Sequence, residues 1–348
     1  MKISVTLPNF NHGNLVGENI ESVIRQTYGN WELVIVDDGS TDESWSVIDS
    51  YRAKDPRIVA KRFESNRGAV AAIGQCMHLC TGELLYGSAA DDYIDNPRFF
   101  ELVVSAVAAN RTAAGVFGQS RVIDGVDGRE LWVMGASSGG GYLTPARAIE
   151  EFGKGGLFVP GASAVWRREF VDRLGGFDPE LGPQCDYFIN HALPMLHGAV
   201  FIDQVVSVTR LFESSYSAAR NDDEFFRYHA LTERKFMSLP LEAPLSDDWR
   251  RAWRSNVMNG RLAITRQRQF SELIKRFYDG IQAWEESSLP QRFQECRREV
   301  LAHCAKLEEE LAARIDRAES VFDDVGGHVP AARASGAGEA PAGSGQDV

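Results

Sequence analysis

The chain has 348 residues, of which 44% are hydrophobic and 25% charged, as is ordinary for globular proteins. This length predicts one large domain with a smaller addition. The formal net charge is −12, which excludes the broad basic face that binds nucleic acid by displacing counterions. An anionic substrate would therefore need a metal ion or local cations.

The cysteines and the apolar runs predict a cytoplasmic protein. None of the five cysteines forms a C-x-x-C pair, so we expect neither a zinc ribbon nor a disulfide framework. The short apolar run after Met1-Lys2 stops at Pro8, which does not fit a signal peptide. No apolar run approaches the roughly 20 residues that cross a bilayer.

Strand and helix signals alternate along the first part of the chain. Short apolar runs end at polar or glycine-containing turns and are followed by stretches of helical periodicity. We predict strands at 3–7, 33–36, 58–62 and 84–86, and helices at 14–26, 41–51, 69–81 and from Pro97 onward. This alternation predicts right-handed crossovers and a Rossmann-like α/β fold with a mostly parallel sheet.

The second half of the chain is less regular at first and then becomes helical. We predict strands at 116–123, 161–166 and 199–209, and helices at 167–174 and from Asp186. From Asp222 onward helical periodicity dominates, notably over 247–285 and 291–323. The apolar stripe over 300–322 indicates either a packing helix or a short coiled coil. Residues 326–348 are rich in Gly, Ala, Pro and Ser and predict a disordered tail.

Three polar clusters follow predicted strands directly. They are Pro8-Asn9, Asp37-Asp38 and Asp91-Asp92. Because ligands bind outside the carboxyl ends of parallel strands, all three are expected at one binding edge.

Each of these acidic pairs has a functional and a structural interpretation. Asp91-Asp92 suits Mg²⁺ or Mn²⁺ held together with substrate phosphates, or else a solvated, helix-capping turn. The Asp38 carboxylate suits the imide N–H of a uracil or thymine ring, or else a turn before Gly39. Asp37 is either a second contact or a brace of the loop.

Further groups would complete a nucleotide site. Pro8 and Asn9 offer backbone groups to a base, and Gly68 allows close approach of the backbone. Arg67 either meets a phosphate or ribose, or is an ordinary surface arginine. Asp186, which begins a helix after a Gly/Pro loop, is either a general base or a plain N-cap.

These residues carry a resemblance to the inverting glycosyltransferases of family 2, which have the GT-A fold. The matching stretches are Ser4–Asn11, Ser22–Tyr28, Trp31–Asp42, Asn66–Gly68, Thr81–Glu83 and Ala90–Asp92, and more loosely Gly175–Asp178 and Asp186-Tyr187. They cover about the first 100 residues closely and continue to roughly residue 210. The helical C-terminal part is not covered.

The resemblance implies a role for each matching residue. Asp38 matches the aspartate that reads the base, Asp91 and Asp92 match the aspartates that bind metal and ribose-diphosphate, and Asp186 matches the catalytic base. The other residues matching the nucleotide site are Pro8, Asn9, Phe10, Asp37, Asn66, Arg67 and Gly68. The implied reaction is a metal-assisted single displacement from a nucleotide sugar, with UDP expected as the nucleotide. The acceptor is a saccharide, a lipid-linked molecule or a small molecule.

The same resemblance implies a division of the chain. We expect a GT-A catalytic domain at 1–215, with a nucleotide-binding half at 1–110 and an acceptor half at 111–215. A helical region at 216–325 and the tail at 326–348 follow. Acceptor choice is expected in the region from Trp132 to Phe158 and in the C-terminal helices.

The chain departs from the family pattern at two positions. Ala89 stands where many relatives have aspartate, and Cys185 stands where many have glutamate before the base. The Q-x-x-R-W motif of processive synthases is absent, which favours addition of a single sugar.

Other interpretations remain open on the sequence alone. A dinucleotide enzyme or a nucleotidyltransferase would use a similar sheet, but the first turn lacks G-x-G-x-x-G. A non-catalytic relative would bind the nucleotide sugar without transfer. A basic, tryptophan-containing segment lies at 249–276. It indicates peripheral contact with the inner membrane face, a solvated helix face that pairs with the acidic catalytic domain, or a homodimer contact.

Overall fold

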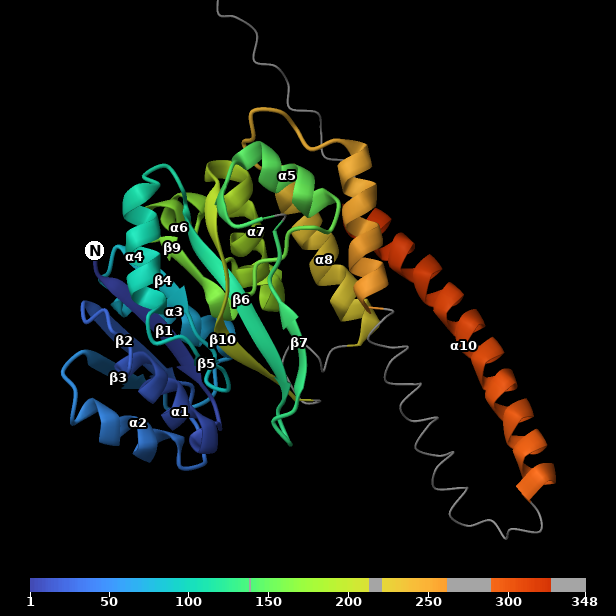
Figure 1. The fold of residues 1–348 in the computed structure, drawn as a ribbon, viewed down its shortest axis with the longest axis horizontal. Helices are drawn as coiled ribbons and strands as arrows, with labels where there is room; N and C mark the ends of the chain where they lie inside the picture. Colours follow the sequence, from blue (N-terminus) through green and yellow to red (C-terminus); the bar gives the residue numbers. More distant parts are fainter. Residues whose placement is uncertain (138, 213–220, 262–288, 327–348) are drawn as a thin grey trace, which may run out of the picture.

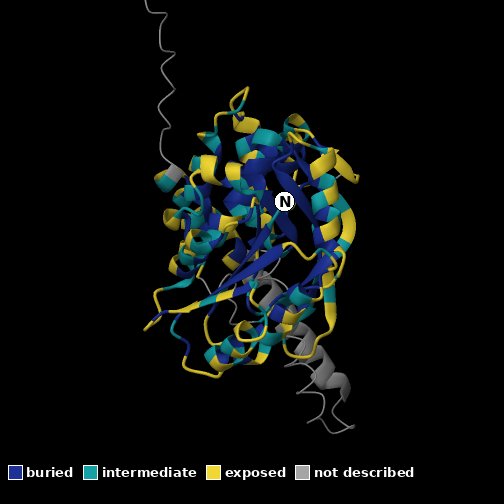
Figure 2. Ribbon diagram, turned by 90° about the vertical axis from the view of Figure 1, so that its left-hand side faces the viewer, coloured by how far each residue is buried: buried dark blue, intermediate teal, exposed yellow. Residues whose placement is uncertain are grey.

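The computed structural model describes residues 1–137, 139–212, 221–261 and 289–326. A ten-stranded sheet lies between layers of helices, and its central strands, such as β1 and β2, are deeply buried (Figures 1 and 2). The strands are β1 Ile3–Asn9, β2 Trp31–Asp37, β3 Ile58–Arg62, β4 Leu84–Gly87, β5 Tyr93–Ile94, β6 Gly115–Asp124, β7 Glu130–Met134, β8 Gly141–Leu143, β9 Ala164–Arg167 and β10 Ala199–Leu211. The α-helices are α1 Gly13–Ile24, α2 Ser44–Arg52, α3 Ala69–Leu79, α4 Phe99–Ala109, α5 Pro145–Gly153, α6 Arg168–Leu174, α7 Cys185–His197, α8 Asp222–Met237 and α10 Leu289–Gly326, with 3-10 turns η1 Gly161–Ser163 and η2 Pro179–Gln184.

The order of the strands separates a parallel part of the sheet from a mixed part. The order is β3-β2-β1-β4-β9-β6-β10-β5, with β7 beside β6 and β8 beside β10. The strands from β3 to β4 are parallel, as predicted. In the second half β6 and β10 are parallel, but β5, β7, β8 and β9 run antiparallel to their neighbours. The mostly parallel sheet is therefore confirmed for the first half, and the second half is mixed.

Alternation along β2 explains why helices cover both faces of the sheet. Leu33 and Ile35 pack with α1, α2 and α4 on one face, whereas Val34 and Val36 pack with α3 on the other. All four side chains are fully buried. A continuous apolar run is what a strand covered on both faces requires.

The C-terminal helices share a core with the sheet domain. Residues 247–261 are helical, and α10 packs on α8 at its C-terminal end while its other end projects away from the body (Figure 1). Phe236, Trp253 and Phe322 of this region belong to the same apolar cluster as Phe188 of α7. The buried Leu311, Ala318 and Phe322 show that the described part of the apolar stripe is a packing surface.

Several elements were not predicted from the sequence. They are β5, β7, β8, α5 and η2, all of them short. The predicted strand at 161–166 begins as η1 and becomes β9 only at Ala164. Part of the predicted helix at 247–285 and the predicted tail lie outside the described residues. No helix in the described ranges is long and apolar enough to cross a membrane.

Candidate active site

The carboxyl ends of β1 and β2 place the first two polar clusters side by side. Asn9 and Asp37 are register partners at the ends of these parallel strands. The Asn9 side-chain nitrogen donates to Asp37 Oδ1 at 2.8 Å and to Ser40 Oγ at 3.2 Å. The predicted edge is therefore formed, and its first two clusters are joined directly.

Asp37 is enclosed by hydrogen-bond donors. Its side chain is fully buried and accepts from the Ser40 backbone N–H at 3.2 Å and the Ser40 hydroxyl at 2.5 Å, besides Asn9. Arg62 at the end of β3 forms an ion pair with it at 3.2 Å. Of the two roles predicted for Asp37, this geometry fits the brace of the loop.

Asp38 is also buried, and it holds the loop before α3. Oδ1 accepts from the Arg67 N–H at 2.7 Å, and Oδ2 accepts from the Gly68 N–H at 2.8 Å. Each carboxylate oxygen has two lone-pair sites, so one on each oxygen remains for a base. Asp38 thus links the end of β2 to the 66–68 loop that was predicted to meet the nucleotide.

The other predicted nucleotide residues lie on the outer surface of this edge. Phe10 is 39% exposed directly after β1, and Pro8 is half-buried. Asn66 and Arg67 are exposed, and the Arg67 guanidinium lies 4.5 Å from the Phe63 ring. Gly68 has a φ of +91°, a conformation that favours glycine.

Asp91 and Asp92 lie in the turn between β4 and β5, and their carboxylates have different surroundings. Asp92 is buried and its Oδ1 accepts from the Arg210 backbone N–H of β10 at 2.9 Å. Burial, followed by the negative charge of Asp91, raises the pKa of Asp92 well above its ordinary value. Asp91 is half-buried, so its carboxylate is the more accessible of the two.

Two residues that the sequence analysis missed hold this turn. Asn19 of α1 is buried, and its amide nitrogen lies within 2.8 Å of Ser88 Oγ and of the backbone oxygens of Ala89 and Asp92. Arg210 donates to the Asp91 backbone oxygen at 2.7 Å and to Glu18 at 2.5 Å. These partners are 69 or more residues apart in sequence, so no local pattern could have revealed them.

Asp186 is in the first turn of α7, at the start of a helix as predicted. Its side chain is reachable by solvent, and Oδ1 accepts from the Tyr187 N–H at 2.8 Å. Protein atoms crowd around the carboxylate, and this burial raises its pKa above the ordinary 3.8 despite the backbone hydrogen bonds, which act in the opposite direction. Oδ2 faces Gly161 so closely that a Cβ there would lie 3.0 Å away.

The 3-10 turn η1 connects Asp186 to the edge that carries Asp91 and Asp92. η1 contacts β4, β5, β6 and β10. Tyr86 of β4 donates its hydroxyl to the Ala162 backbone oxygen at 2.8 Å. The candidate base and the acidic pair are therefore positioned by one connected set of elements.

Most of the basic and tryptophan side chains in the described part of the C-terminal segment pack against the protein. Trp249 and Trp253 are 8% and 1% exposed and pack in the core. Arg250 and Arg254 both contact the fully buried Glu233 at 2.5 Å. Glu233 lies on α8, outside the residues 1–215 that were expected to pair with this segment, and the tryptophans are too buried to contact a membrane. Arg261 pairs with Asp222 of α8, and Arg251 is exposed. Arg266, Arg268, Lys275 and Arg276 lie outside the described residues.

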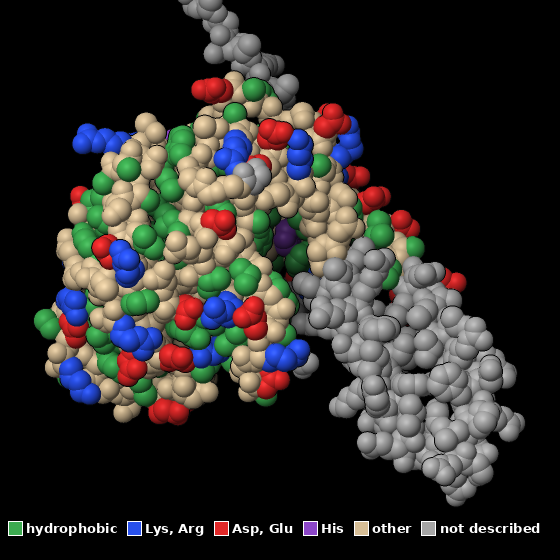
Figure 3. Space-filling view, in the orientation of Figure 1, with side chains coloured by type: hydrophobic (Ala, Val, Ile, Leu, Met, Phe, Trp, Pro, Cys, Tyr) green, Lys and Arg blue, Asp and Glu red, His purple; other side chains and the backbone are tan. Residues whose placement is uncertain are grey.

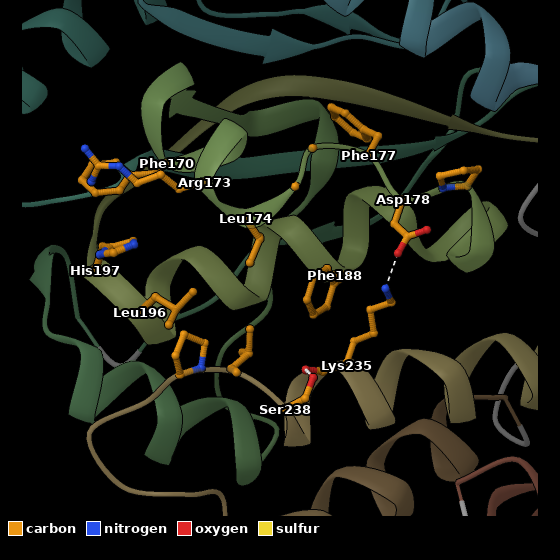
Figure 4. A pocket seen from close by; sticks show the side chains of 15 residues that line it. Phe170, Arg173, Leu174, Phe177, Asp178, Phe188, Leu196, His197, Lys235 and Ser238 are labelled. Atoms are coloured by element: carbon orange, nitrogen blue, oxygen red, sulfur yellow. Dashed lines mark hydrogen bonds and ion pairs between the residues drawn. The ribbon is translucent and has the colours of Figure 1, made fainter. Parts of the chain in front are cut away.

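A cavity of about 740 Å³ lies away from the predicted site residues. Phe170, Phe177 and Phe188 line it, together with the ion pair of Asp178 and Lys235 (Figure 4). On the face shown in Figure 3, basic and acidic side chains are interspersed around a hollow in which a histidine is visible. The candidate site is therefore defined by the sheet edge, and the cavity lined by Phe170, Phe177 and Phe188 is not part of it.

Comparison with known proteins identifies the first half of the chain. The sequence model described as Glycosyl transferase family 2 matches residues 4–175. An uncharacterized glycosyltransferase of Nostoc sp. is 32% identical over 181 residues, which are 51% of this chain and 55% of that protein. The putative colanic acid biosynthesis glycosyl transferase WcaA of Escherichia coli is 41% identical over 92 residues, 26% of this chain and 32% of WcaA. The chain thus spans about half the length of the first relative and a third of the second.

Solved structures match over almost the whole chain. Residues 1–349 of S. aureus TarS, in complex with UDP-GlcNAc, give a TM-score of 0.61 at 16% identity and cover 94% of this chain and 89% of that one. The mannosyltransferase PcManGT of Pyrobaculum calidifontis, in complex with GDP-Man and Mn²⁺, gives 0.55 at 17% identity over 91% and 86%. At such identities the likeness shows the fold, and it confirms the predicted GT-A type sheet with C-terminal helices.

Proposed function

We propose that this chain, whose residues 4–175 match the model of glycosyl transferase family 2, moves a sugar from a UDP-sugar to a hydroxyl or amine of an acceptor. The proposed reaction is a single displacement with inversion at the anomeric carbon, and Asp186 is its general base. The observation that carries this proposal is the Asp186 carboxylate, which is solvent-accessible, has a raised pKa and is connected through η1 to the edge with Asp91 and Asp92.

The chemistry assigns one proton transfer to Asp186. The acceptor oxygen or nitrogen forms a bond to the anomeric carbon, on the face opposite the diphosphate. The bond from that carbon to the phosphate oxygen breaks, and its electron pair leaves with the nucleoside diphosphate. The acceptor proton passes to Asp186, and a carboxylate with a raised pKa is a stronger base for this step.

The acidic pair fits a divalent cation. Its donors are carboxylate oxygens, which Mg²⁺ and Mn²⁺ prefer, and the like charges of two adjacent aspartates favour a cation between them and the substrate. No cluster of three or more His, Cys, Asp or Glu side chains suited to a metal occurs among the described residues, so the phosphates would supply further ligands. When bound, Mn²⁺ or Mg²⁺ neutralises the charge that develops on the leaving diphosphate.

Asp91 is the better candidate of the two for direct ligation. Its carboxylate is more accessible, whereas Oδ1 of Asp92 already accepts from β10. We assign Asp92 mainly to holding the turn in place.

The donor nucleotide is proposed to lie along the ends of β1 and β2. Asp38 is assigned to the base, with Pro8, Asn9 and Phe10 beside it, and the Asn66–Gly68 loop to the ribose or phosphates. UDP is proposed because the TarS structure, which has the same fold, is a complex with UDP-GlcNAc. The PcManGT structure is a complex with GDP-Man. The base identity is therefore the first property to measure.

The division of the chain follows from these assignments. We propose a catalytic domain at 1–215, with nucleotide and acceptor halves that meet near residue 110, and a supporting helical region at 216–325. Acceptor choice is assigned to the 132–158 region and the C-terminal helices. A lipid-linked acceptor would require membrane contact through residues other than Trp249 and Trp253.

Calorimetric titration tests the donor site. UDP, dTDP and GDP are titrated into the protein with and without Mn²⁺, and into an Asp91→Asn variant. We expect metal-dependent binding of UDP that is weakened in the variant. Binding without release of sugar from UDP-GlcNAc or other UDP-sugars would instead indicate a non-catalytic relative, and no binding of any nucleotide would overturn the proposal.

A further inference from the structure

A short segment from Phe158 to Gly161 forms a wall beside the Asp186 carboxylate. The Phe158 backbone pairs with Ala136 through two hydrogen bonds of 3.1 Å. Gly161 at its other end lies against Asp186 Oδ2. The Phe158 ring is 41% exposed, so this wall offers an apolar surface near the candidate base.

His191 joins this wall to the helix that carries Asp186. It lies on α7, and its Nε2 accepts from the Val159 backbone N–H at 3.3 Å. Its Nδ1 is 2.8 Å from the Tyr187 backbone oxygen, to which it donates. A ring that donates through Nδ1 and accepts through Nε2 is the neutral form. If Nε2 were protonated, its N–H would face the Val159 backbone N–H, and the hydrogen bond between them would be lost.

The His191 ring is held rigidly in one orientation. It is fully buried, stacks on Phe152 at 4.3 Å with an interplanar angle of 18°, and lies 4.3 Å from the Tyr187 ring. The Phe158 ring is 5.8 Å from it on the side of the wall. Burial lowers the pKa of His191 to about 4, so it stays neutral near pH 7.

We propose that His191 is a positioning residue that fixes the wall at 158–161 relative to the Asp186 carboxylate, and that this wall guides the acceptor to the base. The proposal rests on the function proposed above. Val159 is two residues from Gly161, and Tyr187 is next to Asp186. One imidazole therefore sets the spacing between the base and the surface opposite it.

A matched histidine allows a controlled test. His229 of α8 is similarly buried, has a lowered pKa of about 4 and makes the same contact to a backbone oxygen four residues earlier, at 2.8 Å from Phe225. Among the described residues no hydrogen bond joins its ring to a separate loop. The variants are His191→Phe, which removes both hydrogen bonds, His191→Gln, whose amide oxygen can still accept from Val159, and His229→Phe.

Two measurements do not need turnover. Hydrogen exchange of the Val159 amide should speed up by about fivefold or more in His191→Phe, since one hydrogen bond is lost, and should recover in His191→Gln. A carbon-13 NMR titration should show the Asp186 pKa falling toward its ordinary value in His191→Phe only. Unchanged exchange and an unchanged Asp186 pKa in a folded His191→Phe variant would overturn the proposal.

Turnover supplies the functional measurement. Hydrolysis of UDP-GlcNAc and GDP-mannose, with water as the acceptor, gives kcat and KM without a known acceptor. We expect kcat of His191→Phe to fall by up to about 10²-fold with donor KM nearly unchanged, because small misplacement of a reacting group has effects of this size. His191→Gln should recover most of the rate, and His229→Phe should lose stability with kcat unchanged. Equal kcat in His191→Phe and His229→Phe would contradict the positioning role.

Gly161→Ala keeps the test decisive if His191→Phe does not fold. The added Cβ would lie 3.0 Å from Asp186 Oδ2 and displace the carboxylate or the wall, so kcat should fall without a change in nucleotide binding. Gly74→Ala on α3 is its control, since nothing lies within 4 Å of a Cβ there. A wild type that binds nucleotide but hydrolyses neither donor would count against the proposed reaction, while the exchange and pKa measurements would still decide the positioning claim.

Discussion

The end of β2 and the first turn of α7 both place an aspartate at the candidate site, yet the two carboxylates have opposite surroundings. Asp37 is fully buried and accepts from Asn9 and Ser40 while paired with Arg62. Asp186 is reachable by solvent, and its one side-chain hydrogen bond in the described part of the chain comes from the next backbone amide. A carboxylate with many donors stabilises a loop, whereas one with few donors and a raised pKa is suited to accept a proton.

Replacing Asp186 should have the largest effect on turnover. Asp186→Asn keeps the shape but removes the base, so kcat should fall by about 10²- to 10⁴-fold. In the wild type the rate should fall as pH decreases through the raised pKa of Asp186, because the protonated carboxyl cannot act as a base. Rate measurements from pH 4 to 8 check both, with UDP affinity as the control. A variant with wild-type kcat would remove Asp186 from the mechanism.

Glu233 is, in contrast to Asp186, a fully buried carboxylate that is paired with two arginines, Arg250 and Arg254. Glu233→Ala leaves Arg250 and Arg254 without their shared partner, and breaking such a buried pair costs about 3 kcal/mol in the free energy of unfolding. Urea denaturation measures this loss. Glu150→Ala, which removes an exposed pair with Lys154, should change stability by less than about 1 kcal/mol.

The same criterion, the number of hydrogen-bond donors around a carboxylate, separates the roles of Asp91 and Asp92. Asp91→Asn should weaken the metal-dependent binding of UDP by about tenfold or more, with little loss of stability. Asp92→Ala should mainly destabilise the turn, because it removes the Oδ1 that accepts from the Arg210 backbone N–H of β10. Calorimetry with and without Mn²⁺, alongside thermal unfolding, separates the two. The reverse pattern would show that Asp92 is the metal ligand.

Buried histidines should make the fold sensitive to acid. His191 and His229 have folded pKa values of about 4 against an ordinary 6.5, so the unfolded chain binds more protons between these values. Stability should therefore be complete above pH 6.5 and fall as pH decreases toward 4, by up to about 1.4 kcal/mol per pH unit for each histidine. Urea titrations across this range measure the slope, and His229→Phe should reduce it. An unchanged slope would mean that another group is responsible.

The smallest effect on folding is expected for Arg67. It is exposed and contacts the Phe63 ring, so Arg67→Ala should alter stability by less than about 0.5 kcal/mol. If Arg67 meets a phosphate, UDP affinity should still fall severalfold, whereas uridine affinity should not change. If the variant binds UDP and uridine as tightly as the wild type does, Arg67 is an ordinary surface residue.

The sequence predicted the parts of the fold that depend on local pattern. The apolar run at 33–36 lies within β2, and the strand predicted at 58–62 is β3. Two of the polar clusters lie at the ends of β1 and β2, and Asp91-Asp92 lies in the turn after β4. The short helix α5 has no comparable apolar run and was missed. The strand β7 was also missed, although it contains the apolar run Leu131–Met134. Contacts such as Asn19 with the turn at Ser88–Asp92 and His191 with Val159 join residues far apart in sequence, so only the packed chain reveals them.

The same reasoning separates what was predictable at the site. Aspartates after buried strands could be identified as a group, because strand ends and residue type are local properties. Which of these aspartates hold a loop in place and which are free to bind a ligand could not be predicted, because this depends on partners from other strands, such as Arg62 and Arg210.

The pairing of β5 with β10 has a consequence for synthesis of the chain. β5 carries the residues directly after the acidic pair, and its strand partner is β10, which ends at Leu211. Ribosomes add about 5–20 residues per second, so Ile94 waits on the order of ten seconds before its partner strand emerges. During that interval Arg210 is not yet available to the turn at Asp91. The turn that carries the acidic pair therefore remains unfinished until β10 has been made.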